Sequence, residues 1–156
     1  YMLDYHVLNS SPLQDEEYQL QVQQAEVERA ALINSGAFLN EESVTLLTDP
    51  AALDAGKQIF TTNCVACHSS DGGGLVGPNL TDDYWIHGGG IKNVFKTIKY
   101  GVVAKGMISW QSQLNPKQMQ DVASYVISLH GTSPANPKQQ EGTIWKESDS
   151  TAVASN

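Results

Sequence analysis

The stretch that decides the fold is Cys64-Val65-Ala66-Cys67-His68, which a glycine-rich loop with Gly77-Pro78 follows. Two cysteines separated by two residues and followed directly by histidine are typical of c-type haem attachment. In such a site each thiol adds to one vinyl group of the porphyrin, and the histidine binds the iron. The motif therefore predicts one covalent haem c, held by Cys64, Cys67 and His68.

The same residues admit two other interpretations. A structural zinc site needs four ligands, so His87 would have to join Cys64, Cys67 and His68. A bare redox pair of the thioredoxin type needs a βα context, which the sequence lacks. Haem is favoured because a helix precedes the motif, a Gly/Pro loop follows it, and a methionine lies in a later loop.

The second axial ligand of the iron is predicted to be Met107. It follows Lys105-Gly106 in a loop, where an apolar side chain has little reason to pack. Met119 falls on the apolar stripe of the last predicted helix and is expected in the core. His87 is the alternative ligand. The choice matters because a thioether ligand raises the reduction potential relative to a second imidazole.

Three further residues are predicted to contact the haem or its ligand. A ligating histidine usually donates its other ring N–H to a carbonyl or carboxylate, and Pro78 is placed to offer a carbonyl. Trp85 and Trp110 are expected to line the pocket or to bind a propionate, and packing alone is the alternative for both.

Apolar periodicity predicts an all-α chain with long loops, and no segment alternates as a strand does. Such loops are unusual in a compact domain unless something fills the space between them, as a haem would. Helices are expected over residues 13–34, from Asp49-Pro50 to the cysteine pair, over 91–98 with a stop near Gly101, and from Asn115-Pro116 to Gly131.

Charge is distributed unevenly along the 156 residues, whose net charge is −8. Residues 1–55 hold ten acidic side chains and one arginine. This acidic segment is interpreted as a solvated helix face, with a docking surface as the alternative. The charge argues against nucleic acid as a partner. Four lysines suggest either a basic rim for an acidic redox partner or another solvated face: Lys92, Lys96, Lys99 and Lys105.

Four stretches together resemble a known family: CVACH, GPNLTDDYWIHGG, IKYGVVAKGMISWQ and LNPKQMQDVASYVISLHG. They resemble class I cytochrome c domains and, in particular, the membrane-anchored cytochrome c subunit (subunit III) of cbb-type haem–copper oxidases. The similarity covers roughly residues 50–133. It implies crossing first and last helices with Gly56, Phe60 and Tyr125 at the crossing. It also implies His68 and Met107 as axial ligands.

The resemblance further implies oxidase core subunits and other cytochromes as partners, at the periplasmic face of the bacterial cytoplasmic membrane. The predicted domains are an acidic helical arm over 1–47, a monohaem domain over 48–133 and a flexible tail over 134–156. The apolar start of the chain suggests a membrane anchor upstream of Tyr1, and an N-terminus packed on the body is the alternative. One departure is clear, since that subunit typically carries two haem domains and this chain has a single C-x-x-C-H.

The expected function is electron relay to a respiratory terminal oxidase, without catalysis by this chain alone. Four alternatives remain at this point. The domain could belong to another membrane complex, could be a free periplasmic electron carrier, could be fused to a dehydrogenase, or could sense a gas that displaces the methionine.

Overall fold

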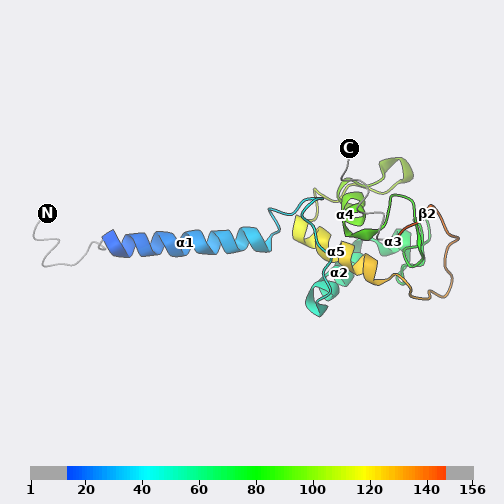
Figure 1. The fold of residues 1–156 in the computed structure, drawn as a ribbon, viewed down its shortest axis with the longest axis horizontal. Coiled ribbons are helices and arrows are strands. Elements are labelled where there is room, and N and C mark those ends of the chain that lie inside the picture. The colour runs from blue at the N-terminus through cyan, green and yellow to red at the C-terminus, as the bar shows by residue number, and fades with distance from the viewer. Residues whose placement is uncertain (1–13, 147–156) are drawn as a thin grey trace, which may run out of the picture. The chain divides into compact units, whose positions relative to one another are not determined.

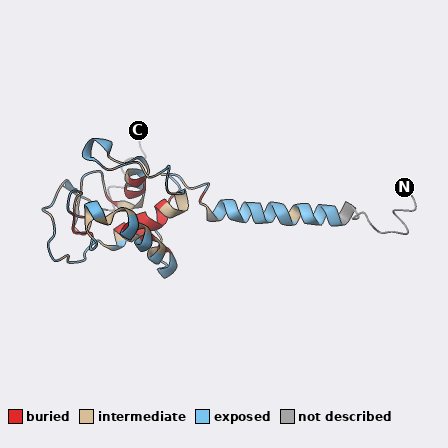
Figure 2. Ribbon diagram, turned by 180° about the vertical axis from the view of Figure 1, so that it is seen from behind, coloured by how far each residue is buried: buried red, intermediate tan, exposed pale blue. Residues whose placement is uncertain are grey.

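The computed structural model describes residues 14–146 and divides into two compact units, Tyr1–Asn34 and Ser35–Asn156. The first unit contains α1 (Gln14–Asn34), whose sequence is rich in the helix-forming residues Gln, Glu and Ala. The helix predicted over 13–34 is thus confirmed, with residue 13 outside the described part. Most of its described side chains are exposed (Figure 2). The expectations for the start of the chain, and for the tail beyond residue 146, lie outside the described residues.

The second unit is built from three main helices and several short elements (Figure 1). Its elements are α2 (Pro50–Asn63), α3 (Val65–His68), β1 (Tyr84–Trp85), α4 (Gly90–Tyr100), the 3-10 turn η2 (Val103–Lys105), α5 (Pro116–Ser128) and β2 (Thr143–Ile144). The only sheet in the described part is the antiparallel pair β1–β2. The class is all-α as predicted, although the short strand pair was not foreseen. Within residues 14–146, no helix has the length and hydropathy needed to span a membrane.

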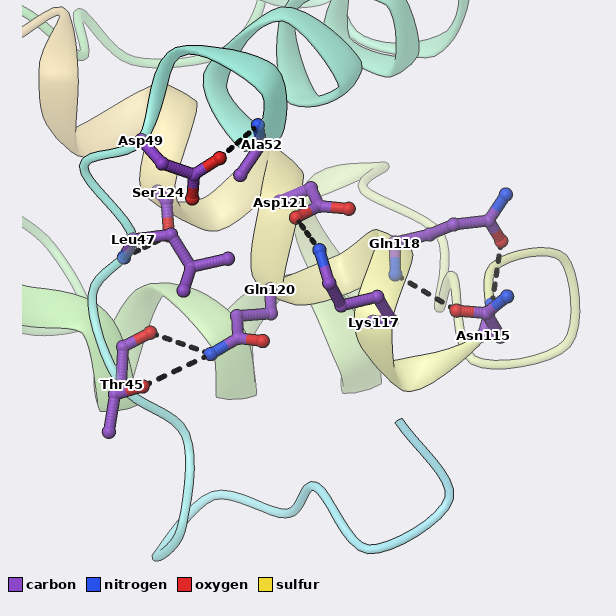
Figure 3. A network of polar contacts seen from close by, with 10 residues as sticks. All are labelled: Thr45, Leu47, Asp49, Ala52, Asn115, Lys117, Gln118, Gln120, Asp121 and Ser124. Carbon is purple, nitrogen blue, oxygen red and sulfur yellow. Dashed lines mark hydrogen bonds and ion pairs between the residues drawn. The ribbon is translucent and has the colours of Figure 1, made fainter. Parts of the chain in front are cut away.

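Local capping sets the starts of α2 and α5. The Asp49 side chain accepts a hydrogen bond of 2.9 Å from the amide of Ala52, and Pro50 occupies the first turn. Asn115 and Gln118 bond each other's backbone amides at 2.9 Å, which makes a capping box (Figure 3). Both helix starts were predicted because these signals involve residues only three positions apart.

Helices α2 and α5 cross at Gly56, as the resemblance implied. A β-carbon added to Gly56 would lie 2.7 Å from the carbonyl carbon of Asp121 and 2.8 Å from Cβ of Tyr125. Beyond this contact, the rings of Phe60 and Tyr125 pack with centroids 5.4 Å apart and planes at 60°. The crossing therefore depends on a position without a side chain, flanked by an aromatic pair.

The hydrophobic core lies where α5 packs on α2 and on α4. Met119 is buried there, as predicted. The core residues are Val44, Phe60, Val94, Phe95, Ile98, Met119, Val122, Ala123 and Val126.

The segment before α2 also belongs to this core, although the sequence assigned it to the arm. Val44 is only 2% exposed. The amide of Leu47 donates to the hydroxyl of Ser124 at 3.1 Å, and the side-chain amide of Gln120 donates to the carbonyl of Thr45 at 2.8 Å (Figure 3). The second compact unit therefore begins at Ser35. The start of the haem domain at residue 48 stays a prediction.

The last helix ends earlier than expected. Gly131 was predicted to close it, but it ends at Ser128, with Leu129 as its cap. The amide of Gly131 donates to the carbonyl of Thr81 at 2.8 Å, and so it no longer bonds within the helix. This bond turns the chain toward the loop that follows the cysteine motif.

Candidate haem site

The cysteine motif forms a short turn of helix directly after α2. Cys64 is the C-cap residue of α2 and the N-cap residue of α3. The amide of His68 donates to the carbonyl of Cys64 at 2.9 Å, which closes the turn around the pair of cysteines. Both cysteines are free thiols, with Cys64 half-buried and Cys67 exposed. Both thiols therefore lie on one helical turn, the placement that attachment to a single porphyrin requires.

The environment keeps the Cys64 thiol protonated. Burial, with a smaller contribution from the neighbouring Cys67, raises the pKa of Cys64 to about 11. At neutral pH the side chain is therefore a neutral thiol, which makes it a weak nucleophile toward solutes.

His68 is held as a neutral imidazole in one orientation. Its Nδ1 lies 3.1 Å from the carbonyl oxygen of Pro78. Because a carbonyl only accepts, Nδ1 carries the proton and the Nε2 lone pair is available to a metal. Burial lowers the pKa of His68; the bond to Pro78 opposes this effect, and the Lys138 charge adds to it. No described residue hydrogen-bonds Nε2.

The loop after His68 is fastened to the motif by backbone hydrogen bonds. The amides of Leu75 and Gly77 both donate to the carbonyl of Cys67, at 3.0 and 2.9 Å, and the amide of Gly74 donates to that of His68 at 2.9 Å. Gly77 passes so close to the imidazole that an added β-carbon would lie 2.6 Å from Cε1 of His68. A glycine is therefore needed at position 77 to leave room for the ring.

Met107 lies in a tight hairpin-like turn after α4. It pairs with Val102 through hydrogen bonds of 2.8 and 3.2 Å. The turn begins at Gly101, whose φ of +70° is one that residues with side chains rarely adopt. The Met107 side chain is half-buried and packs against the core, whereas His87 is exposed.

The two tryptophans also pack against the core. Trp85 is half-buried in β1, and Trp110 is half-buried with its amide 3.2 Å from the carbonyl of Ile98. The predicted site residues that contact this one core cluster are Cys64, Met107, Trp85 and Trp110.

Comparisons with known proteins agree with this geometry. Residues 51–126 match the family model for cytochrome c oxidase, cbb3-type, subunit III. A solved structure of cytochrome cL from Methylophaga aminisulfidivorans is 30% identical, covers 53% of this chain and 56% of its own, and superposes with a TM-score of 0.50. The second unit thus has the fold of a class I cytochrome c.

The second unit also has curated relatives among oxidase subunits. The cbb3-type cytochrome c oxidase subunit CcoP of Rhodobacter capsulatus is 42% identical over 95 residues, which cover 53% of this chain and 31% of the relative. CcoP of Rubrivivax gelatinosus is 37% identical over 95 residues, covering 60% and 31%. FixP of Sinorhizobium medicae is 39% identical, covering 55% and 32%. The chain thus spans about a third of the length of these relatives.

The residues of the cytochrome domain fit a covalent haem better than they fit zinc. They offer two free thiols and a neutral imidazole with an open Nε2, and a thioether lies against the same core as Cys64. Within residues 14–146, no group of three or more His, Cys, Asp or Glu side chains converges as a metal site would require. His87 therefore does not complete a four-ligand zinc site.

Acidic residues offset part of the expected basic rim. Lys99 pairs with Glu41 at 3.0 Å and Lys92 pairs with Glu42 at 3.3 Å. Lys96 and Lys105 are exposed. The lysines of α4 thus serve in part to hold the segment that precedes α2.

Sequence reasoning missed two residues that shape the His68 environment. Gly77 belongs to a quoted motif, and its place directly before Pro78 was the available signal. Lys138 lies in the stretch that was expected to be flexible, and nothing in its local pattern indicated a contact with the loop after His68.

Proposed function

We propose that this domain carries one haem c, bound through Cys64 and Cys67, with His68 and Met107 as the axial ligands of the iron. The observation that carries the proposal is the neutral, oriented His68 beside two free thiols on one helical turn. The half-buried Met107 is preferred to the exposed His87 as the second ligand because its thioether already packs against the core. Trp85 and Trp110 are assigned to the wall of the pocket.

We further infer that the domain relays electrons to a terminal oxidase. When bound, the haem supplies a one-electron iron couple, which a histidine–methionine pair places at a high potential. The chain's own residues orient the imidazole, exclude water through the packed aromatic side chains, and anchor the group covalently. The names of the relatives support the oxidase assignment. A position at the periplasmic face of the membrane is proposed because the resemblance to subunit III implies it.

The ligand assignment is tested by visible spectroscopy of protein made with the cytochrome c maturation machinery. The oxidised wild type is expected to show the weak far-red sulfur-to-iron charge-transfer band, and Met107→Ala is expected to lose it. His87→Ala is the matched control and should retain the band. A low-spin spectrum without the band in the wild type would assign the second ligand to a nitrogen instead.

The relay is tested separately from the ligands. The reduced protein is expected not to bind carbon monoxide without denaturant, because both axial positions are filled. It should pass electrons to a purified cbb3-type oxidase at a rate that falls in Met107→Ala. Binding of carbon monoxide by the native reduced protein would instead favour the gas-sensor alternative.

A further inference from the structure

The stretch from Pro134 to Trp145 lies across the loop that follows the cysteine motif, and we call it the C-terminal strap (Figure 1). The amide of Lys138 donates to the carbonyl of Gly73 at 2.8 Å. Farther along, β2 of the strap pairs with β1, and the amide of Trp145 donates to the carbonyl of Asp83 at 3.0 Å. The strap is therefore fastened at two places along its length.

Two glycines outside the strap, Gly73 and Gly89, allow the strap to pack closely against them. A β-carbon on Gly73 would lie 2.8 Å from Cβ of Pro134, and one on Gly89 would lie 2.6 Å from Cγ of Trp145. These approaches leave no space for a side chain at either glycine. The strap thus packs specifically against the loop after His68 and against the start of α4.

Lys138 is a residue of the strap that contacts the loop beside the histidine. Its ammonium group lies 3.2 Å from the carbonyl of Val76 and 3.5 Å from that of Gly77. The same group forms an ion pair of 2.6 Å with Glu141, three residues farther along the strap. The side chains of Lys138 and Glu141 are 34% and 40% exposed, so solvent screens this pair only in part.

Lys138 therefore contacts the turn that fixes the histidine. Val76 and Gly77 come directly before Pro78, whose carbonyl accepts the proton of Nδ1. An ammonium group that bonds two successive carbonyls restrains the backbone that carries them. It also places a positive charge close to His68, and this charge contributes to the lowered pKa of that residue.

We propose that Lys138 is a positioning residue for the axial ligand His68, which it fixes through the Val76–Gly77 turn, and that its charge raises the reduction potential of the domain. This inference rests on the proposed haem ligation. Oxidation of the iron adds one positive charge, and a nearby ammonium group disfavours that state. Glu141 offsets part of the charge, so the two residues are expected to shift the potential in opposite directions.

The test compares four variants of the holoprotein. Lys138→Met removes the charge and the hydrogen bonds, Lys138→Arg retains both, and Glu141→Gln removes the opposing carboxylate. Lys57→Met is the matched control, because Lys57 is an exposed lysine of α2 and its loss changes the net charge equally. The first readout is the reduction potential, and the second is hydrogen exchange of the amides of Leu75 and Gly77.

The expected results differ in sign between variants. The potential should fall in Lys138→Met, rise in Glu141→Gln, and stay near the wild-type value in Lys138→Arg and Lys57→Met. Exchange at Leu75 and Gly77 should be about twofold to tenfold faster in Lys138→Met, which is the size expected when one partly exposed hydrogen bond is lost. The Cys64 amide, which donates to Phe60 within α2, should exchange unchanged.

Two results would overturn the inference. One is a potential in Lys138→Met equal to that in Lys57→Met. The other is faster exchange without a shift in potential, which would show that the strap stabilises the loop but does not affect the reduction potential. Neither result affects the proposed function, which is tested on the wild-type protein by its haem spectrum, its carbon monoxide binding and its electron transfer to the oxidase.

Discussion

The Nδ1 atom of His68 and the carbonyl oxygen of Pro78 lie 3.1 Å apart, across a loop that brings residues ten positions apart together. Gly77 makes this contact possible, since its backbone passes so close to the imidazole that an added β-carbon would meet the ring. Gly77 thus leaves space for the ring, and the carbonyl of Pro78 fixes the ring's orientation. The arrangement sets both the tautomer of the histidine and the direction of its free nitrogen.

Gly77→Ala is expected to displace the imidazole and lengthen the bond to Pro78. Its β-carbon would meet three ring atoms of His68 at 2.6 to 2.9 Å. Overpacking of this kind lowers the free energy of unfolding by about 1–3 kcal/mol. Chemical denaturation gives that value, and the NMR shift of the Nδ1 proton reports the hydrogen bond.

Gly131→Ala is the control for this change. Gly131 has a φ of +79° and nothing within 4 Å of an added β-carbon, so its cost is limited to the backbone. That cost is about 1–2 kcal/mol. Equal stability of the two variants, with an unshifted Nδ1 proton, would show that the ring is not tightly confined.

Local features of this fold were predictable from sequence. Asp49 and Asn115 cap their helices through amides three residues away, so the signal and its structural effect lie within one turn. The His68–Pro78 contact was also expected, because a ligating imidazole needs an acceptor and the following loop offers one. These predictions succeeded because each interaction is made within a short stretch of chain.

The C-terminal strap could not be predicted in the same way. Its anchors are backbone groups, such as the amide of Lys138 and the β1–β2 pair, and backbone bonds leave no periodicity in the sequence. Gln120 and Ser124 are similar cases. Each is a buried polar residue of α5 whose partner lies more than 70 residues earlier in the chain. Only the folded core brings such partners together.

Ser69 offers a test of backbone strain next to the histidine. It is the only described residue other than glycine with a positive φ, at φ +66° and ψ +159°. That region is populated almost only by glycine, and a side chain there costs of the order of 1–3 kcal/mol. Ser69→Gly should therefore be more stable than Ser69→Ala by about 1 kcal/mol in denaturant unfolding. Both variants lose the hydroxyl, so the comparison isolates the β-carbon. A less stable glycine variant would contradict the assigned conformation.

Gly56→Ala is expected to separate α2 from α5. The added β-carbon would meet the backbone of Asp121 and Cβ of Tyr125, and backbone cannot move aside as a flexible side chain can. We expect a loss of about 3 kcal/mol in the free energy of unfolding. Gln58→Ala, on the exposed face of the same helix, should change it by less than about 0.5 kcal/mol. A wild-type stability for Gly56→Ala would show that the crossing tolerates a wider spacing.

The Glu41–Lys99 pair should make stability depend on pH. The pKa of Glu41 is lowered from its ordinary 4.5 to about 2. The largest cause is the hydrogen bond from Tyr100, followed by Glu41's backbone bond and the bond from Lys99. A carboxylate with a lowered folded-state pKa stabilises the protein above the unfolded-state value. The contribution, about 0.5–1 kcal/mol for a partly exposed pair, is lost as the pH falls from about 4.5 through 2.

Glu41→Gln should therefore be less stable than the wild type at pH 7, and the difference should vanish below about pH 2. Glu42→Gln is the matched control, because its carboxylate is 89% exposed and its pair with Lys92 is longer, at 3.3 Å. Solvent screens such a pair, so this variant should match the wild type at every pH. Denaturant unfolding at a series of pH values measures both. A difference for Glu41→Gln that stays constant with pH would assign the effect to lost packing rather than to charge.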